Sequence, residues 1–132
     1  MSMLLDFLVE NPVDDVTEQV VISQRLAKFP FTIKAMSGTE FSAYQKRATK
    51  YSKSKKVEFD SKLFNEQVVI NHTVEPNFRD AEAIKKAGCL TPEQFLYRSL
   101  LAGEIAELAE RISALSGFDA DIEAVVEEAK NS

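Results

Sequence analysis

The sequence predicts an α+β domain that is mostly helical, with an N-terminal β-hairpin packed on about five short helices. Two observations carry this prediction. Two apolar runs of strand type stand close together near the N-terminus, as the arms of a hairpin do. Most of the remaining chain repeats its apolar residues at intervals of three and four, the spacing of a buried helix face. A length of 132 residues predicts one domain over 1–132 that can bury a core without disulfides or metals.

The first fifteen residues open with a short apolar segment. Its large side chains recur at helical spacing: Met3, Leu4, Phe7 and Leu8. We expect a helix here that docks partly on the core, inside a flexible segment 1–15. Asn11-Pro12 then breaks the helical pattern.

Two strands are predicted next, over 18–24 and 29–36, and paired as an antiparallel hairpin. The first contains the β-branched run Val20-Val21-Ile22. In the second, apolar residues from Phe31 to Ala35 alternate with polar ones. Two strands alone are marginally stable in water, so the hairpin must lean on helices or gain a third strand.

Ser37 and Glu40 have the spacing of a capping box, which predicts the start of a helix rich in lysine. A mobile basic linker is predicted after it, over 52–58. Asp60 is placed to cap a further helix over 61–72, although the β-branched residues around Val69 make a strand over 66–72 the competing prediction.

Asp80 is expected to cap a short helix over 81–87 that Gly88 closes. Thr91 is the next predicted N-cap, with Pro92 at the first helical position, where its missing N–H costs nothing.

A break is predicted near Ala102-Gly103, with Glu104 in the first turn of a new helix, where the helix dipole favours a carboxylate. The buried stripe of that helix is Ile105, Leu108, Ala109, Ile112 and Leu115. Gly117 is expected to end it in the left-handed conformation, with Phe118 folding back onto its last turn.

The last segment, 119–132, is predicted to be a terminal amphipathic helix. Its apolar face consists of Ile122, Val125, Val126 and Ala129. This helix either docks on the core or offers an exposed face to a partner.

Charge is segregated along the chain, whose net charge is −5. The segment from Asp6 to Glu18 contains five acids and no base, whereas 42–57 contains six bases and no acid. Acids dominate again after Glu104. Such a distribution favours head-to-tail self-association and steers encounters with charged partners.

The basic segment 46–56 is the one feature typical of nucleic-acid-binding proteins, since tyrosines are interleaved with its basic residues. The bases are Lys46, Arg47, Lys50, Lys53, Lys55 and Lys56. A pI near 5.0 opposes phosphate binding by the whole domain, so a solvated helix face is the favoured interpretation and nucleic acid the disfavoured one.

Catalytic and metal-ligating residues are scarce. His72 is the only histidine and Cys89 the only cysteine, and both are expected to be structural. One of each cannot build a zinc site without several carboxylates, and the glycines are too dispersed for a phosphate loop. We therefore expect no enzyme, no cofactor and no metal. The single cysteine and the lack of a long apolar run favour a cytoplasmic protein that does not enter membranes.

Four short segments carry a resemblance to a known family. They are Val74-Glu75-Pro76-Asn77-Phe78, Thr91-Pro92-Glu93, Leu100-Leu101-Ala102-Gly103-Glu104 and Leu115-Ser116-Gly117-Phe118. With these segments in this order, the chain from about Val16 onward resembles the XkdN-like family of phage tail assembly chaperones, found in phages and prophages of Gram-positive hosts. The segments are packing and corner signatures rather than catalytic motifs.

The resemblance implies a protein that binds the tape-measure protein of the phage tail, keeps it soluble in the host cytoplasm during tail assembly, and is absent from the mature virion. Homo-oligomers fit the segregated charge. The partner-binding residues that we predict are Leu115, Phe118, Ile122, Val125 and Val126. The alternative function is a phage-encoded adaptor that binds nucleic acid or an acidic protein through the basic segment 46–56.

Overall fold

The computed structural model describes residues 2–54 and 56–118. The α-helices in this part are α1 (Met3–Glu10), α2 (Gly38–Ala48), α3 (Ser61–His72), α4 (Ala81–Lys86), α5 (Pro92–Ser99) and α6 (Ala102–Ser113). The strands are β1 (Thr17–Val20), β2 (Phe31–Lys34), β3 (Thr49–Tyr51), β4 (Val57–Phe59) and β5 (Thr73–Glu75). A 3-10 turn over Val13–Asp15 precedes β1, and a π-helical turn over Ala114–Phe118 follows α6. The predicted class, α+β and mostly helical, is confirmed.

The predicted N-terminal hairpin is present as β1 and β2, with Thr17 opposite Lys34 and Val20 opposite Phe31. A third strand, β5, pairs antiparallel with the other edge of β2 and completes a sheet of order β1-β2-β5. The sequence predicts that two strands need support, and β5 supplies part of it. The strand was not predicted, because its three residues lie between a helix and the Glu75-Pro76 bond.

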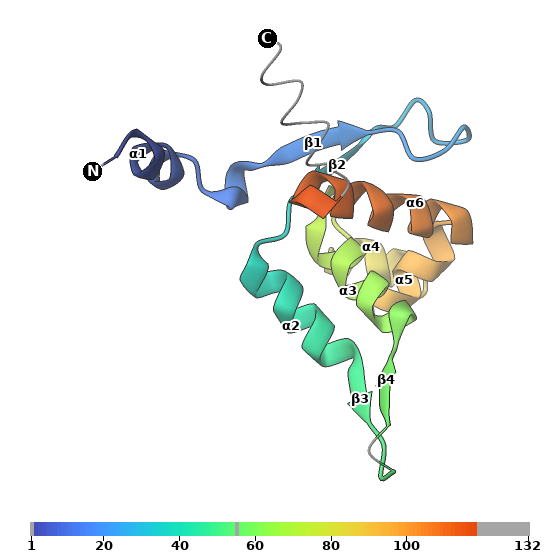
Figure 1. The fold of residues 1–132 in the computed structure, drawn as a ribbon. Helices are drawn as coiled ribbons and strands as arrows, with labels where there is room; N and C mark the ends of the chain where they lie inside the picture. Colours follow the sequence, from blue (N-terminus) through green and yellow to red (C-terminus); the bar gives the residue numbers. More distant parts are fainter. Residues whose placement is uncertain (1, 55, 119–132) are drawn as a thin grey trace.

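Helix α3 is the centre of the fold, packed against α2, α5 and α6 (Figure 1). The segment 66–72 is helical, so the strand alternative there is wrong. Side chains of α3 meet those of the sheet and of α6 in one hydrophobic core. Its most buried members are Ile33, Val68, Val69, Phe78, Leu96, Leu108 and Ile112.

The predicted helix caps are confirmed. Ser37 Oγ accepts the backbone N–H of Glu40 at 3.1 Å, and the Glu40 carboxylate accepts that of Ser37 at 3.0 Å, which completes the capping box. Asp60, Asp80 and Thr91 cap α3, α4 and α5 through their side chains. The sequence therefore fixes where these helices begin.

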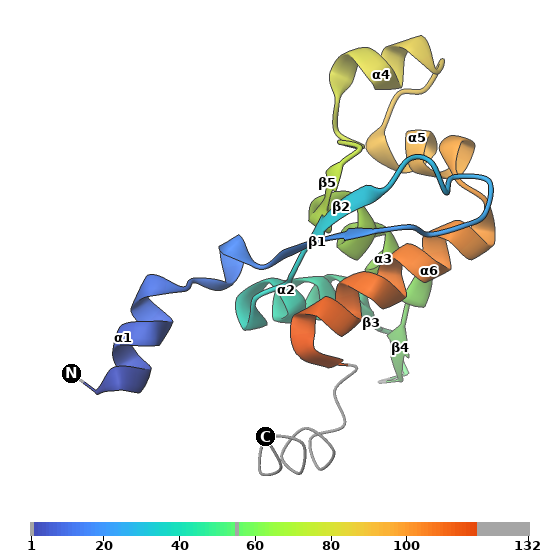
Figure 2. The same ribbon diagram turned by 90° about the horizontal axis from the view of Figure 1, so that it is seen from above.

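Helix α1 forms as predicted, but its predicted docking on the core is wrong. Every residue of α1 is exposed to solvent. Figures 1 and 2 show the helix standing away from the body at the N-terminal end of an extended segment. Its apolar residues lie around most of the helix rather than on one face, and an extended stretch near Pro12 separates it from the sheet.

The segment 52–58, predicted to be a linker, instead belongs to a second hairpin that projects from the body (Figure 1). In this hairpin β3 pairs antiparallel with β4, and Tyr51 lies opposite Val57. Its strands have three residues each and bury almost none of their side chains, so the sequence carries no alternating pattern by which to predict them.

The predicted break before α6 lies one to two residues earlier, at Leu100 and Leu101. Leu100 is extended and buried in the core, while Gly103 is inside the first turn of α6. The position of the break between α5 and α6 therefore depends on burial of the Leu100 side chain and not on the conformational freedom of Gly103.

Candidate functional site

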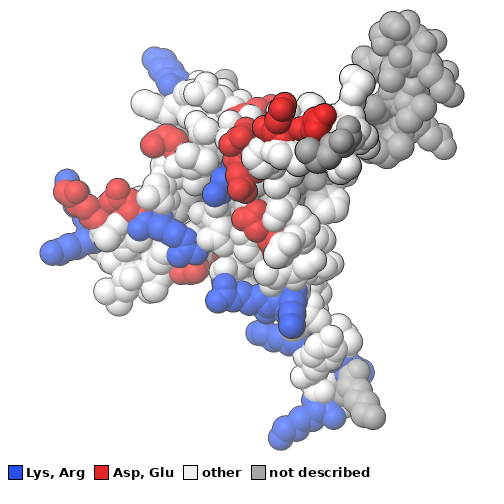
Figure 3. Space-filling view, turned by 90° about the vertical axis from the view of Figure 1, so that its left-hand side faces the viewer, with Lys and Arg blue, Asp and Glu red and all other residues white. Residues whose placement is uncertain are grey.

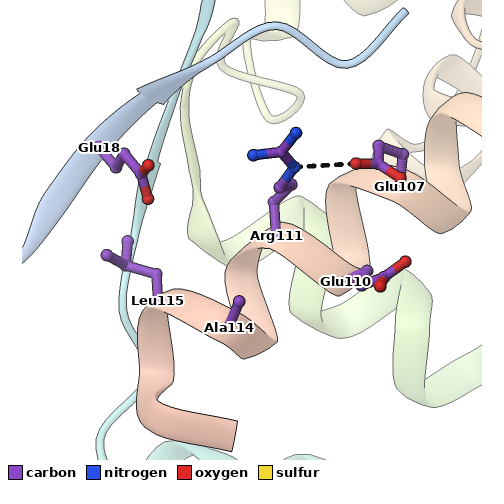
Figure 4. A pocket seen from close by; sticks show the side chains of 6 residues that line it. All are labelled: Glu18, Glu107, Glu110, Arg111, Ala114 and Leu115. Atoms are coloured by element: carbon purple, nitrogen blue, oxygen red, sulfur yellow. Dashed lines mark hydrogen bonds and ion pairs between the residues drawn. The ribbon is translucent and has the colours of Figure 1, made fainter. Parts of the chain in front are cut away.

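The candidate site lies where the C-terminal end of α6 meets β1. An open hollow of about 600 Å³ is lined by Glu18 from β1 and by five residues of α6 and the turn after it: Glu107, Glu110, Arg111, Ala114 and Leu115 (Figure 4). Arg111 donates its Nε–H to Glu107 at 2.8 Å, so part of the acidic rim is neutralised. Glu18 and Glu110 leave the hollow with acidic character.

The end of α6 is held in place by its buried face and by one serine. The predicted stripe is confirmed from Ile105 to Ile112, whereas Leu115 is only half-buried. Ser116 Oγ donates to the carbonyl of Ile112 at 2.7 Å and accepts the backbone N–H of Met36 at 2.9 Å. This pair of bonds ties the turn after α6 to the segment that follows β2, and so places Leu115 beside β1.

Gly117 adopts a φ of 98°, the left-handed conformation predicted for it. The ring of Phe118 lies against Phe41 of α2, with ring centroids 4.8 Å apart, a neighbour that the sequence did not predict. Phe118 remains 60% exposed. It therefore offers a large apolar surface at the point where the described chain ends.

Two of the predicted partner-binding residues, Leu115 and Phe118, thus lie on one end of α6. The other three, Ile122, Val125 and Val126, lie outside the described residues.

The predicted basic patch is brought together around the β3–β4 hairpin. Lys46 and Arg47 end α2, and Lys50, Lys53 and Lys56 follow on the hairpin and its turn, whereas Lys55 lies outside the described residues. Figure 3 shows basic side chains along the lower part of this face and acidic ones above them. Arg47 donates to Gln67 at 2.9 Å, so it is tied to α3 more closely than the lysines.

The only histidine serves packing. His72 is completely buried, and its Nε2 lies 2.8 Å from the hydroxyl of Tyr44, which joins α3 to α2. Burial lowers the pKa of His72, although the Glu40 carboxylate opposes this effect. The partners of His72 Nε2, Tyr44 and Glu40, both belong to α2, so the imidazole joins two helices in the core.

Cys89 lies elsewhere, in a shallow hollow beside Ile84 and Leu90. Its thiol donates to the carbonyl of Ala87, with 3.7 Å between the sulfur and oxygen atoms. Within residues 2–54 and 56–118, no group of three His, Cys, Asp or Glu side chains is arranged to hold a metal ion.

A buried carboxylate, Glu104, is a polar feature that the sequence did not reveal. Its side chain is 3% exposed and accepts hydrogen bonds from Ser23 Oγ at 2.5 Å, Arg25 Nη2 at 2.6 Å and the Leu101 N–H at 2.7 Å. The sequence places Glu104 at the helix start but gives no sign of the two partners, which come from the loop between β1 and β2.

Comparison with known proteins identifies the family. The model of the phage XkdN-like tail assembly chaperone proteins matches residues 4–130, nearly the whole chain. The chain belongs to this family. The chain is also 30% identical over 107 residues to a Bacillus subtilis (strain 168) protein named "Uncharacterized protein YqbN", a match that covers 77% of this chain and 72% of that protein.

The crystal structure of the protein YqbN has the same fold. The match covers 90% of this chain and 99% of the YqbN chain, with a TM-score of 0.68 and 24% sequence identity. Among the helices of residues 2–54 and 56–118, none has the length and apolar character that crossing a membrane requires.

Proposed function

We propose that this tail assembly chaperone binds the tape-measure protein of its phage and keeps it soluble until the tail tube forms around it. The family match over residues 4–130 carries this proposal. A long protein with exposed apolar stripes aggregates unless another protein covers them. Many copies of a small domain with an apolar binding surface and a charged exterior would cover these stripes.

We assign this binding surface to the C-terminal end of α6, the turn after it, and the hollow beside them. Phe118 offers an exposed aromatic ring, and Leu115 lines the hollow. The sequence predicts that Ile122, Val125 and Val126 continue this apolar surface. An amphipathic helix of the partner would lay its apolar face on these side chains, and basic residues flanking that face would meet Glu18 and Glu110.

Co-expression with the tape-measure protein tests the assignment. A variant with Ile122→Asp and Val126→Asp, and a second variant with Phe118→Asp, should lose capture of the tape-measure protein. Both should remain folded by circular dichroism, although Phe118→Asp should lower the melting temperature because it removes the ring packed on Phe41. Leu90→Asp is the matched control, since Leu90 is 87% exposed beside α5, on the loop after α4. If both variants still capture the tape-measure protein, the binding site lies on another surface.

The proposed role is non-enzymatic and confined to the host cytoplasm during assembly. The protein should therefore be present in lysates of induced cells and absent from purified virions, as measured by mass spectrometry. Detection in virions at the copy number of a structural protein would contradict this part of the proposal.

A further inference from the structure

We propose that copies of this chain associate with one another, with α1 of one copy docked on the β3–β4 hairpin of a second copy. Both elements project from the body with apolar side chains in solvent, and they carry opposite charge.

Helix α1 has the composition of a segment that is buried against a partner. Six of its eight residues are large and apolar: Met3, Leu4, Leu5, Phe7, Leu8 and Val9. Met3 is 89% exposed and Phe7 60% exposed. An apolar patch of this kind on a helix that stands free of its own core marks an interaction site.

The β3–β4 hairpin offers an apolar surface of similar kind. Tyr51 is 78% exposed, and Val57 and Phe59 are also exposed. Tyr51 and Phe59 line an open hollow of about 440 Å³ between the hairpin and the end of α2, with Lys46 on its edge. An aromatic side chain from α1 would enter this hollow.

Charge complementarity identifies the occupant of each surface. On α1 the polar residues are Asp6 and Glu10, and the chain continues through further acids as far as Glu18 without a base. The hairpin and the end of α2 carry Lys46, Lys50, Lys53 and Lys56. The acidic, apolar helix of a second copy therefore matches the basic, apolar hairpin in both respects.

Within one copy, α1 and the described part of the hairpin do not contact each other. Figures 1 and 2 show α1 and the hairpin at separate ends of the molecule, with α2 between them. A contact between unlike surfaces of two copies is heterologous, so it leaves one free helix and one free hairpin at the ends of each assembly. The number of copies in an assembly therefore increases with protein concentration, unless the assembly closes into a ring.

Light scattering after size exclusion tests the proposal on the full chain without any tape-measure protein, so its result is independent of the proposed chaperone function. The wild type should increase in mass with concentration at low salt, and high salt should reduce this increase because it screens the charge pairs. A strictly monomeric wild type over the whole range would overturn the proposal.

Charge reversal locates the contact. The helix variant carries Asp6→Lys and Glu10→Lys, and the hairpin variant carries Lys53→Glu and Lys56→Glu. Each alone should be monomeric with unchanged circular dichroism. An equimolar mixture should regain association, because the acidic helix of the hairpin variant then faces the unchanged basic hairpin of the helix variant, and the basic helix of the helix variant faces a hairpin that has lost its excess of positive charge. The matched control, Lys85→Glu with Lys86→Glu on α4, should assemble like the wild type.

Two outcomes would overturn the assignment. The first is assembly by either variant alone at the wild-type level. The second is a mixture that stays monomeric. If the wild type stays monomeric and the hairpin variant instead loses binding of labelled DNA, the hairpin is a nucleic-acid surface and the proposal is wrong.

Discussion

Replacement of Glu104 by glutamine tests how the β1–β2 loop is fastened to the corner before α6. Glutamine keeps the shape of the side chain but removes its charge. Burial alone would raise the pKa of Glu104, but hydrogen bonds from Arg25, Ser23 and the Leu101 N–H outweigh it and lower the pKa from 4.5 to about 2. The folded state therefore holds the ionised form more favourably than the unfolded chain does.

The size of the effect follows from this difference. A carboxyl pKa that falls from 4.5 to about 2 corresponds to about 3 kcal/mol of stabilisation at neutral pH. Arg25 is 47% exposed, so water screens part of its attraction. We therefore expect Glu104→Gln to lower the free energy of unfolding by about 2 kcal/mol at pH 7.

The pH dependence gives the sharper test. Because the folded-state pKa is lowered, this stabilisation is present above the unfolded value near 4.5 and is lost as the pH falls towards 2. Urea unfolding followed by circular dichroism should show the wild type and Glu104→Gln converging over that interval. Glu110→Gln, on the exposed side of the same helix, is the control and should change stability little. A difference between the wild type and Glu104→Gln that is absent at pH 7, or that stays constant down to acidic pH, would refute the reasoning.

Three further changes in stability are expected, each measured as a free energy of unfolding in urea. Tyr44→Phe removes the hydroxyl bonded to His72 and should cost about 1 to 2 kcal/mol; an unchanged stability would mean that this bond contributes nothing. Gly117→Ala forces a side chain into a φ of 98° and should cost about 1 kcal/mol; a gain would show that the turn relaxes freely. Leu4→Ser with Leu8→Ser should stay within about 0.5 kcal/mol at concentrations where the chain is monomeric, because both side chains are exposed, and a large loss would mean that α1 packs on the core in solution.

The helix starts could be predicted from the sequence because they depend on local chemistry. Ser37, Asp60, Asp80 and Thr91 each cap a helix through a bond to a residue three positions away, and such spacing is visible in the sequence. The buried face of α6 could be predicted for the same reason, since its period is set by the helix itself.

Very short strands, and features that depend on contacts distant in the sequence, could not be predicted. Strands β3, β4 and β5 have three residues each, too few for a recognisable alternation. Glu104 receives bonds from residues about eighty positions away, and the ring of Phe118 lies against Phe41 of α2. Of the five predicted partner-binding residues, only Leu115 and Phe118 fall within the described chain.

The most direct test of the proposed chaperone function is co-expression with the tape-measure protein of the same phage, followed by affinity capture and light scattering after size exclusion. The account predicts a soluble complex in which several copies of this chain accompany each tape-measure protein. An insoluble tape-measure protein, with this chain eluting alone, would contradict it.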